Sequence, residues 1–259
     1  MENDSVKKTL IVATLLCVVC SVLVSTAAVK LKPLQDKNKA LSTKANILRA
    51  AGLMEEGADV EELYKKIQVR YVNLATGEFD DSVDPVKFNR KKALKDLSLS
   101  VEIPAELDIA KIKRRVKIVP IYLVRESDQL KTIILPIHGK GLWSTMYAFL
   151  ALEGDGDTVR GYAFYDHGET PGLGGEVDNP LWRGQWVGKK IYDQDFKLAV
   201  DIVKGKVNRD KPLAIHQVDG LSGATLTTIG VRNLTRYWLG DHGFGKFLSN
   251  IRERRATNG

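Results

Sequence analysis

The sequence predicts an α+β fold, in which a largely antiparallel, twisted sheet with flanking helices follows one N-terminal transmembrane helix. Residues 9–29 contain no charged side chain. Between residues 116 and 165, runs of β-branched and aromatic residues alternate with Gly and Asp turns. Helix signals lie on both sides of these runs, and strands enclosed by helices in this way are typical of an α+β domain.

The apolar run at residues 9–29 is flanked by lysines on both sides. About 20 apolar residues are enough to cross a bilayer as one helix. A cleaved signal peptide is the alternative, because the small residues at 25–28 offer a cleavage site. The run is longer than the roughly 7–15 residues of a signal h-region, so the sequence favours a retained anchor after a short stub at residues 1–8.

Cysteine and histidine give no sign of a metal site. Cys17 and Cys20 both lie in the apolar run, where we interpret them as small apolar side chains rather than a C-x-x-C redox or metal motif. No cysteine follows, so redox chemistry in the rest of the chain requires an organic cofactor. We interpret the four histidines as separate turn or surface residues: His138, His167, His216 and His242.

The helices before and after the sheet are predicted from spacing and capping residues. A heptad of Leu34, Leu41 and Leu48 indicates a juxtamembrane stalk at residues 30–57, which leaves 58–259 as the large domain. Further helix starts are expected at Asp59, at Asp84-Pro85 for a helix to about Leu97, and at Asn179-Pro180 for a helix with Trp182 and Trp186 on one face. Strands are expected at 67–71, 116–124, 132–137, 145–152, 159–165 and 197–203.

The net charge of +7 lies after the anchor, partly in basic runs at 90–92 and 111–115. No recognisable nucleic-acid module accompanies these runs, and a membrane tether argues against a nucleic-acid partner. We therefore interpret them as a solvated face, or as a face toward acidic membrane lipid or a partner subunit.

The most informative segment runs from Asp219 to Thr225. It resembles the acceptor motif of the FMN-binding domain family, in which an Asp lies six residues before a Thr or Ser whose hydroxyl carries FMN as a phosphoester. Apolar residues at 226, 229, 234 and 237 recur at helical spacing up to Gly240, so Thr225 is expected near a helix N-terminus. Unpaired N–H groups and the helix dipole favour a phosphate there. The alternative is that Ser222 or Thr225 only caps the helix.

Two glycine-rich segments, 139–144 and 167–176, could lie close to a flat ligand, because glycine lets the backbone approach it. Taken alone, each could equally be an ordinary turn. Neither has the G-x-G-x-x-G spacing or the βαβ context of a dinucleotide fingerprint.

These three motifs in this order, the apolar N-terminal segment and Pro180-Leu181-Trp182 resemble the C subunits of sodium-translocating NADH:quinone oxidoreductases over nearly the whole chain. The G subunits of Rnf electron-transport complexes are similar. The resemblance implies a bacterial inner-membrane complex of six subunits, with a cytoplasmic stub and the large domain on the periplasmic side. It also implies that electrons pass through covalent FMN towards a flavin in another subunit.

The resemblance assigns a role to each matching residue. Thr225 would carry the FMN, and a separate flavin transferase would read Asp219, Ser222, Gly223 and Ala224. The residues that would border the flavin ring are Gly141, Leu142, Trp143, Glu169, Thr170, Leu173 and Gly174. Two other functions stay open, namely an extracytoplasmic binding or assembly module without flavin and a self-contained flavoprotein reductase. The second is less favoured because acid–base residues do not cluster.

Overall fold

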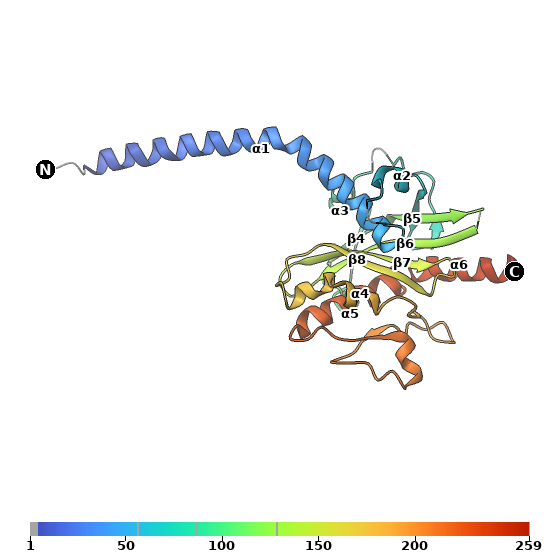
Figure 1. Cartoon of the computed structure of the whole chain (residues 1–259). Coiled ribbons are helices and arrows are strands. Elements are labelled where there is room, and N and C mark those ends of the chain that lie inside the picture. The colour runs from blue at the N-terminus through green and yellow to red at the C-terminus, as the bar shows by residue number, and fades with distance from the viewer. Residues whose placement is uncertain (1–4, 56, 86–87, 128, 259) are drawn as a thin grey trace. The chain divides into compact units, whose positions relative to one another are not determined.

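The computed structural model describes residues 5–55, 57–85, 88–127 and 129–258, and the chain divides into two compact units between Thr43 and Lys44 (Figure 1). The first unit is the N-terminal part of one long helix, α1 (Val6–Ala50). Its most apolar stretch of 18 residues has a mean hydropathy of 2.6, and it is long enough to cross a membrane. The expected anchor at 9–29 lies wholly within this helix.

α1 continues without a break from the anchor into the expected stalk at 30–57 but ends at Ala50, and Pro33 lies inside it. Leu34 and Leu41 are exposed, whereas Leu48 is fully buried, because the last turns of α1 belong to the second unit. Just after the helix the chain turns at Gly52, whose positive φ of 66° favours glycine, and the N–H of Leu53 donates back to Leu48 O at 2.9 Å.

The second unit is built on a six-stranded sheet of order β2-β1-β5-β6-β7-β8, in which all neighbouring strands are antiparallel. This confirms the expected antiparallel sheet. The strands are β1 (Ile67–Asn73), β2 (Glu78–Phe79), β5 (Ile118–Glu126), β6 (Gln129–Lys140), β7 (Thr145–Glu153) and β8 (Val159–Asp166).

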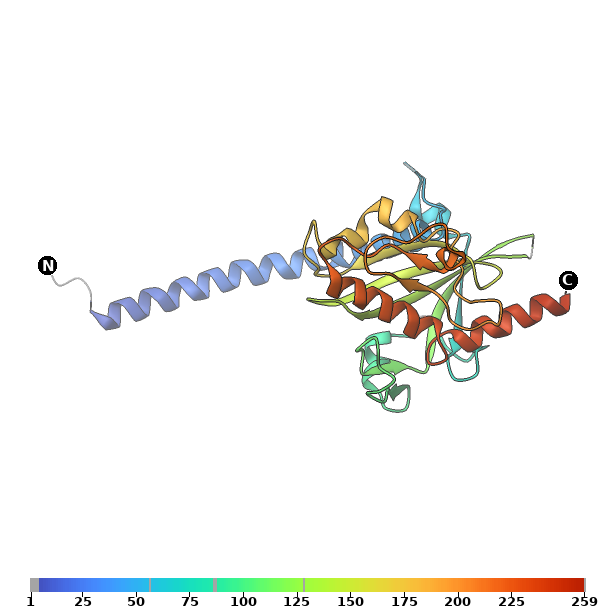
Figure 2. The ribbon, with the colours of Figure 1, turned by 90° about the horizontal axis from the view of Figure 1, so that it is seen from below.

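Both faces of the sheet are covered. The end of α1 lies on one face with α2 (Val60–Tyr64), and α5 (Thr225–Leu239) lies across the other (Figures 1 and 2). Successive residues of β7 pack alternately into the two cores, because successive side chains along a strand point to opposite faces of the sheet. Leu150 packs in the α5 core, and its neighbours Phe149 and Ala151 pack in the α1 core. Strands buried on both sides explain why β6 and β7 are almost continuously apolar.

The helix α4 (Pro180–Gly184) begins as expected, with Asn179 as its N-cap. Trp182 and Trp186 are both buried, with ring centroids 6.0 Å apart. A further helix, α6 (Gly245–Asn258), was not predicted, and it extends the α5 core through Phe247 and Leu248. Apart from one short helix described below, the remaining elements are β3 (Ser100–Glu102), β4 (Arg114–Val116), β9 (Asp201–Ile202), β10 (Gln217–Val218), and two 3-10 helices, η1 (Gly174–Asp178) and η2 (Pro212–His216).

Two expected elements differ in extent. The helix predicted from Asp84-Pro85 to Leu97 is instead α3 (Arg90–Lys95), whose N-cap is Asn89. Residues 86 and 87 of that prediction lie outside the described residues. The strand predicted at 197–203 shrinks to the two residues of β9, which pair in parallel with β10. Capping by Asn89 and irregular pairing at β9 override the local sequence preference.

His138 is not the surface residue that the sequence suggested. It lies in β6 with 7% of its surface exposed, and its ring stacks on Tyr147 at 5.5 Å. Burial and the nearby charge of Arg90 hold the pKa of His138 well below its ordinary value, so the ring is neutral. By contrast, His242 is exposed, and His216 is half-buried with Nδ1 2.9 Å from Lys190 O.

Candidate functional site

Three segments that are distant in the sequence meet at the N-terminus of α5. β6 ends at Lys140, β7 begins at Thr145 and β8 ends at Asp166, so the loop at 141–144 and the segment at 167–175 lie at the same end of the sheet. The third segment, 219–224, leads into α5. The structure therefore brings together the three motifs that the sequence singled out.

Glu169 holds these segments together. Only 5% of its surface is exposed. Its carboxylate accepts hydrogen bonds from the backbone N–H groups of the β6–β7 loop and from a hydroxyl on α5. The donors are Leu142 N at 3.2 Å, Trp143 N at 3.0 Å, Ser144 N at 3.4 Å and Thr227 Oγ1 at 2.5 Å.

The bonds to Glu169 also decide its charge. Burial favours the protonated form, but the hydrogen bonds from Thr227 and from the loop N–H groups outweigh it and hold the pKa of Glu169 below its ordinary value. The Glu169 side chain is therefore ionised, and its hydrogen bonds connect the β6–β7 loop to α5. In this structure its carboxylate points at protein donors, so it positions the site rather than offering a free polar group.

Two glycines near Glu169 are required by close packing. A Cβ on Gly141 would lie 2.5 Å from Glu169 Oε1, and a Cβ on Gly174 would collide with the hydroxyl of Thr227. Any larger residue would separate the loops from α5. The sequence identified both glycines but gave no sign of Thr227, because its partner lies 58 residues away.

Trp143 is 66% exposed at the tip of the β6–β7 loop, and its indole Nε1 donates to Thr170 Oγ1 at 3.2 Å. Ser144, another residue that the sequence did not single out, accepts a bond from Gly168 N at 2.6 Å. His167 accepts a bond from Glu169 N at Nδ1 and lies 2.9 Å from Asp178 through Nε2. These bonds fix the loops around an outward-facing indole.

Thr225 is the first residue of α5, and its side chain is exposed. The N-cap residue is Ala224, and no side chain caps the helix. Within the described part of the chain, the Thr225 hydroxyl has no hydrogen-bond partner. The first helical bond runs from Thr228 N to Ala224 O at 2.9 Å, which leaves the N–H groups before it without helical acceptors. The interpretation of Ser222 or Thr225 as a cap is therefore wrong for this structure.

Exposed apolar side chains lie on the first turns of α5 and on the loops beside its N-terminus. Leu226 is 59% and Ile229 is 42% exposed, although their helical spacing suggested a buried face. Leu234 and Tyr237 of the predicted apolar stripe are buried, and the rest of the buried face of α5 includes Thr227, Thr228, Val231 and Trp238. Leu142 and Leu173 are also exposed nearby, and Leu173 Cδ2 would lie 3.1 Å from a Cβ on Gly223. This apolar surface is where a bulky ring linked to Thr225 could lie.

Asp219 is held in place by hydrogen bonds to neighbouring segments of the chain. Its carboxylate accepts a bond from Val207 N at 2.7 Å, and its own N–H donates to Gln185 Oε1 at 3.2 Å. Its carbonyl accepts from Trp182 Nε1 at 2.8 Å. Asp219 therefore sets the path of the chain into α5 rather than contacting Thr225 itself.

Comparison with known proteins agrees with this geometry. Residues 141–240 match the model of the FMN-binding domain family. The chain is 51% identical to the C subunit of the Na(+)-translocating NADH-quinone reductase from Pseudomonas aeruginosa, over 98% of this chain and 99% of that protein. It is 49% identical to the protein of the same name from Yersinia pestis, over 100% and 97% of the two chains.

The chain belongs to the family of Na(+)-translocating NADH-quinone reductase C subunits. The crystal structure of Shewanella oneidensis NqrC has the same fold, with a TM-score of 0.73, 34% sequence identity, and coverage of 82% of this chain and 96% of that one. The resemblance seen in the sequence is thus confirmed over the full length. The FMN-binding match contains the three segments of the site from residue 141 onward.

The residues at the site fit a linked FMN in this member of the family. A threonine hydroxyl without a partner among the described residues is available for a phosphoester, and the uncapped N–H groups of α5 offer donors to its phosphate oxygens. Leu142, Leu173 and Leu226 offer apolar contacts for a ring. In the described residues, no group of His, Cys, Asp and Glu is arranged to hold a metal ion.

Proposed function

We propose that this chain carries FMN through a phosphoester on Thr225 and relays electrons between other redox groups of a Na⁺-translocating NADH-quinone reductase. The observation that carries the proposal is the exposed Thr225 hydroxyl, which has no partner among the described residues and lies at the uncapped start of α5. The bound FMN would supply one-electron redox chemistry, while the chain positions the ring and shapes its surroundings.

Attachment requires a flavin transferase and FAD. The Thr225 Oγ attacks the phosphorus on the FMN side of the FAD diphosphate, a new O–P bond forms, and AMP leaves as the P–O–P bond breaks. A base of the transferase takes the hydroxyl proton. The exposure of Ser222, Gly223 and Thr225 supports this proposal, because an external enzyme must reach the backbone and hydroxyl together.

The main alternative is a binding or assembly module without flavin. Acid denaturation of the full chain separates the two proposals. A covalently attached flavin stays with the denatured polypeptide, whereas a flavin that is bound without a covalent bond is released. Chain produced with the transferase should give a yellow, fluorescent precipitate. Colourless polypeptide from such cells would support the module instead.

We expect Asp219→Ala to lower flavin attachment strongly. The substitution removes the acceptor for Val207 N and frees the segment before α5, at a cost in unfolding free energy of about 1–2 kcal/mol. Asp193→Ala is the matched control, because the Asp193 carboxylate likewise accepts bonds from backbone N–H groups, here Asp195 N and Lys197 N, but in a loop away from the site. Intact mass spectrometry measures the fraction of chain that carries flavin. Equal flavin attachment in both variants would show that Asp219 acts only as a turn residue.

We further propose that residues 9–29 span the inner membrane, with residues 1–8 in the cytoplasm and the FMN-binding domain outside it. Both native cysteines lie in the apolar part of α1, so the Cys17→Ser/Cys20→Ser chain accepts a single reporter. Lys92→Cys in the domain should react with an impermeant maleimide in intact cells, and Ser5→Cys should react only after lysis. The reverse pattern would contradict this orientation.

A further inference from the structure

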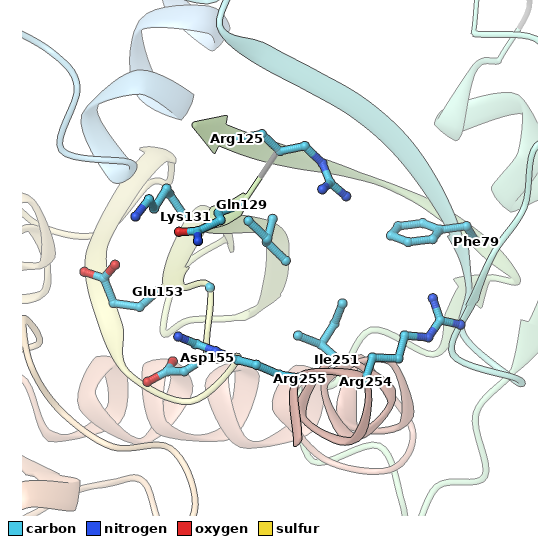
Figure 3. A pocket seen from close by; sticks show the side chains of 11 residues that line it. Phe79, Arg125, Gln129, Lys131, Glu153, Asp155, Ile251, Arg254 and Arg255 are labelled. Atoms are coloured by element: carbon cyan, nitrogen blue, oxygen red, sulfur yellow. The ribbon is translucent and has the colours of Figure 1, made fainter. Parts of the chain in front are cut away.

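A groove of about 790 Å³ lies at the end of the sheet opposite to the Thr225 site (Figure 3). Its walls are the start of β6 and the end of β5, the turn after β7, and the C-terminal turns of α6. β7 has nine residues, and a strand rises about 3.3 Å per residue, so this end lies roughly 30 Å from the Thr225 end. A ligand in this groove is therefore separate from a flavin on Thr225.

The groove carries an excess of positive charge. Four cations line it, Arg125, Lys131, Arg254 and Arg255, against two carboxylates, Glu153 and Asp155. Figure 3 shows Arg125 and Lys131 across the groove from Arg254 and Arg255.

Both carboxylates of the groove are already paired with cations that do not line it. Glu153 pairs with Arg160 at 3.2 Å, and Asp155 pairs with Lys190 at 3.3 Å. Burial favours protonation of Asp155, but hydrogen bonds from Thr158 and Asp157 and the charge of Lys190 outweigh it and lower its pKa. The carboxylates are thus satisfied without the cations of the groove.

Two cations on opposite walls remain available. Within the described residues, neither Lys131 nor Arg255 makes a hydrogen bond or an ion pair through its side chain, whereas Arg254 pairs with Glu78 at 2.5 Å. Three apolar side chains also line the groove, Leu130, Ile251 and Phe79. The groove therefore combines two available positive charges with apolar side chains.

The walls are held in place by backbone contacts. Gly154 N donates to Lys131 O at 2.8 Å, and a Cβ on Gly154 would overlap Leu130 O, so the two turns pack backbone against backbone. α6 is tied to the β1–β2 turn, because Asn250 Nδ2 donates to Gly77 O at 3.1 Å. A preformed groove loses little conformational entropy when it binds.

We propose that this groove binds an acidic segment of another subunit of the complex, with at least two carboxylates on either side of an apolar side chain. Charge complementarity supports this occupant, since the two available cations lie on opposite walls rather than converging on one point. The volume is typical of a site for an extended ligand and exceeds what one inorganic anion fills. The proposal rests on membership of the family and is independent of flavin attachment at Thr225.

The test uses the tagged full-length chain co-expressed with the other subunits of the complex. Lys131→Glu/Arg255→Glu should lower the amount of co-purified subunits about tenfold, because attraction becomes repulsion. Lys131→Arg/Arg255→Lys should retain them, and Lys65→Glu/Lys66→Glu, at two exposed positions outside the groove and outside the basic runs, controls for net charge. Covalent flavin should be unchanged in every variant, which separates this test from that of Thr225.

A photoreactive residue in place of exposed Gln129 then identifies the occupant. The expected product is a crosslink to a peptide of another subunit that contains clustered Asp or Glu. Full retention of the subunits by the charge-reversed chain would overturn the proposal. A crosslink only to lipid, or to a peptide without carboxylates, would overturn it as well.

Discussion

We expect Thr225→Val to remove covalent flavin from the chain completely. Valine keeps the shape of threonine but has no hydroxyl, so no phosphoester can form at this position. The side chain is exposed and its hydroxyl makes no bond within the described residues, so we expect the unfolding free energy to change by less than about 0.5 kcal/mol. Flavin fluorescence of the denatured chain on a gel measures the loss.

Two variants control this prediction. Thr225→Ser keeps a hydroxyl and should still accept flavin. Thr227→Val, two residues along α5, removes a buried hydroxyl that donates to Glu169, so it should destabilise the domain by about 1–3 kcal/mol while leaving the Thr225 hydroxyl in place. Covalent flavin on Thr225→Val would place the attachment on another residue.

Glu169→Ala should have the largest effect on the stability of the site. It leaves three backbone N–H groups and the Thr227 hydroxyl without their acceptor. Because the carboxylate is buried and charged, we expect a loss of about 2–4 kcal/mol in unfolding free energy and a strong fall in flavin attachment. Denaturant unfolding and intact mass spectrometry measure the two effects.

Glu169→Gln is the sharper comparison. Oε1 accepts from Trp143 and Ser144, while Oε2 accepts from Leu142 and Thr227. A glutamine has one acceptor oxygen and can satisfy only one of these pairs. Glu169→Gln should therefore lower the unfolding free energy, but by less than Glu169→Ala does. A glutamine variant as stable as the native chain would contradict the role of the Glu169 carboxylate in connecting the loop to α5.

The same residue predicts a pH dependence. The pKa of Glu169 is lowered in the folded chain, so its contribution to stability is fully present above its ordinary value of 4.5 and is lost as the pH falls through the lower folded pKa. The native chain should therefore lose more unfolding free energy than Glu169→Gln between neutral pH and that acidic range. Equal losses in both proteins would assign the acid sensitivity to other groups.

The sequence predicted the parts of the fold that depend on local signals. Runs of β-branched and aromatic residues between Gly and Asp turns placed β5 to β8, and Gly240 marked the end of α5 as expected. Features that depend on tertiary contacts were not predictable in this way. His138 looked like a turn residue because its glycine neighbour suggested a loop, yet β6 is buried on both faces.

In the candidate site, too, the sequence predicted the features that have a local signal and missed those that depend on tertiary contacts. The acceptor segment and the two glycine-rich loops were recognised, because their residue types match a family motif. The exposed position of Leu226 and Ile229 was missed, since helical spacing of apolar residues normally indicates a core face. The bond between Glu169 and Thr227 has no local signal, because only the folded sheet brings these residues together.

Peptide mapping of the native chain tests the central claim most directly. The full-length chain is purified from membranes of cells that contain the transferase, digested and analysed by tandem mass spectrometry. The account predicts that the peptide containing Thr225 is heavier by FMN less one water, with fragment ions that place the added mass on Thr225. An unmodified Thr225 in flavin-bearing chain, or FMN mapped to another residue, would contradict it.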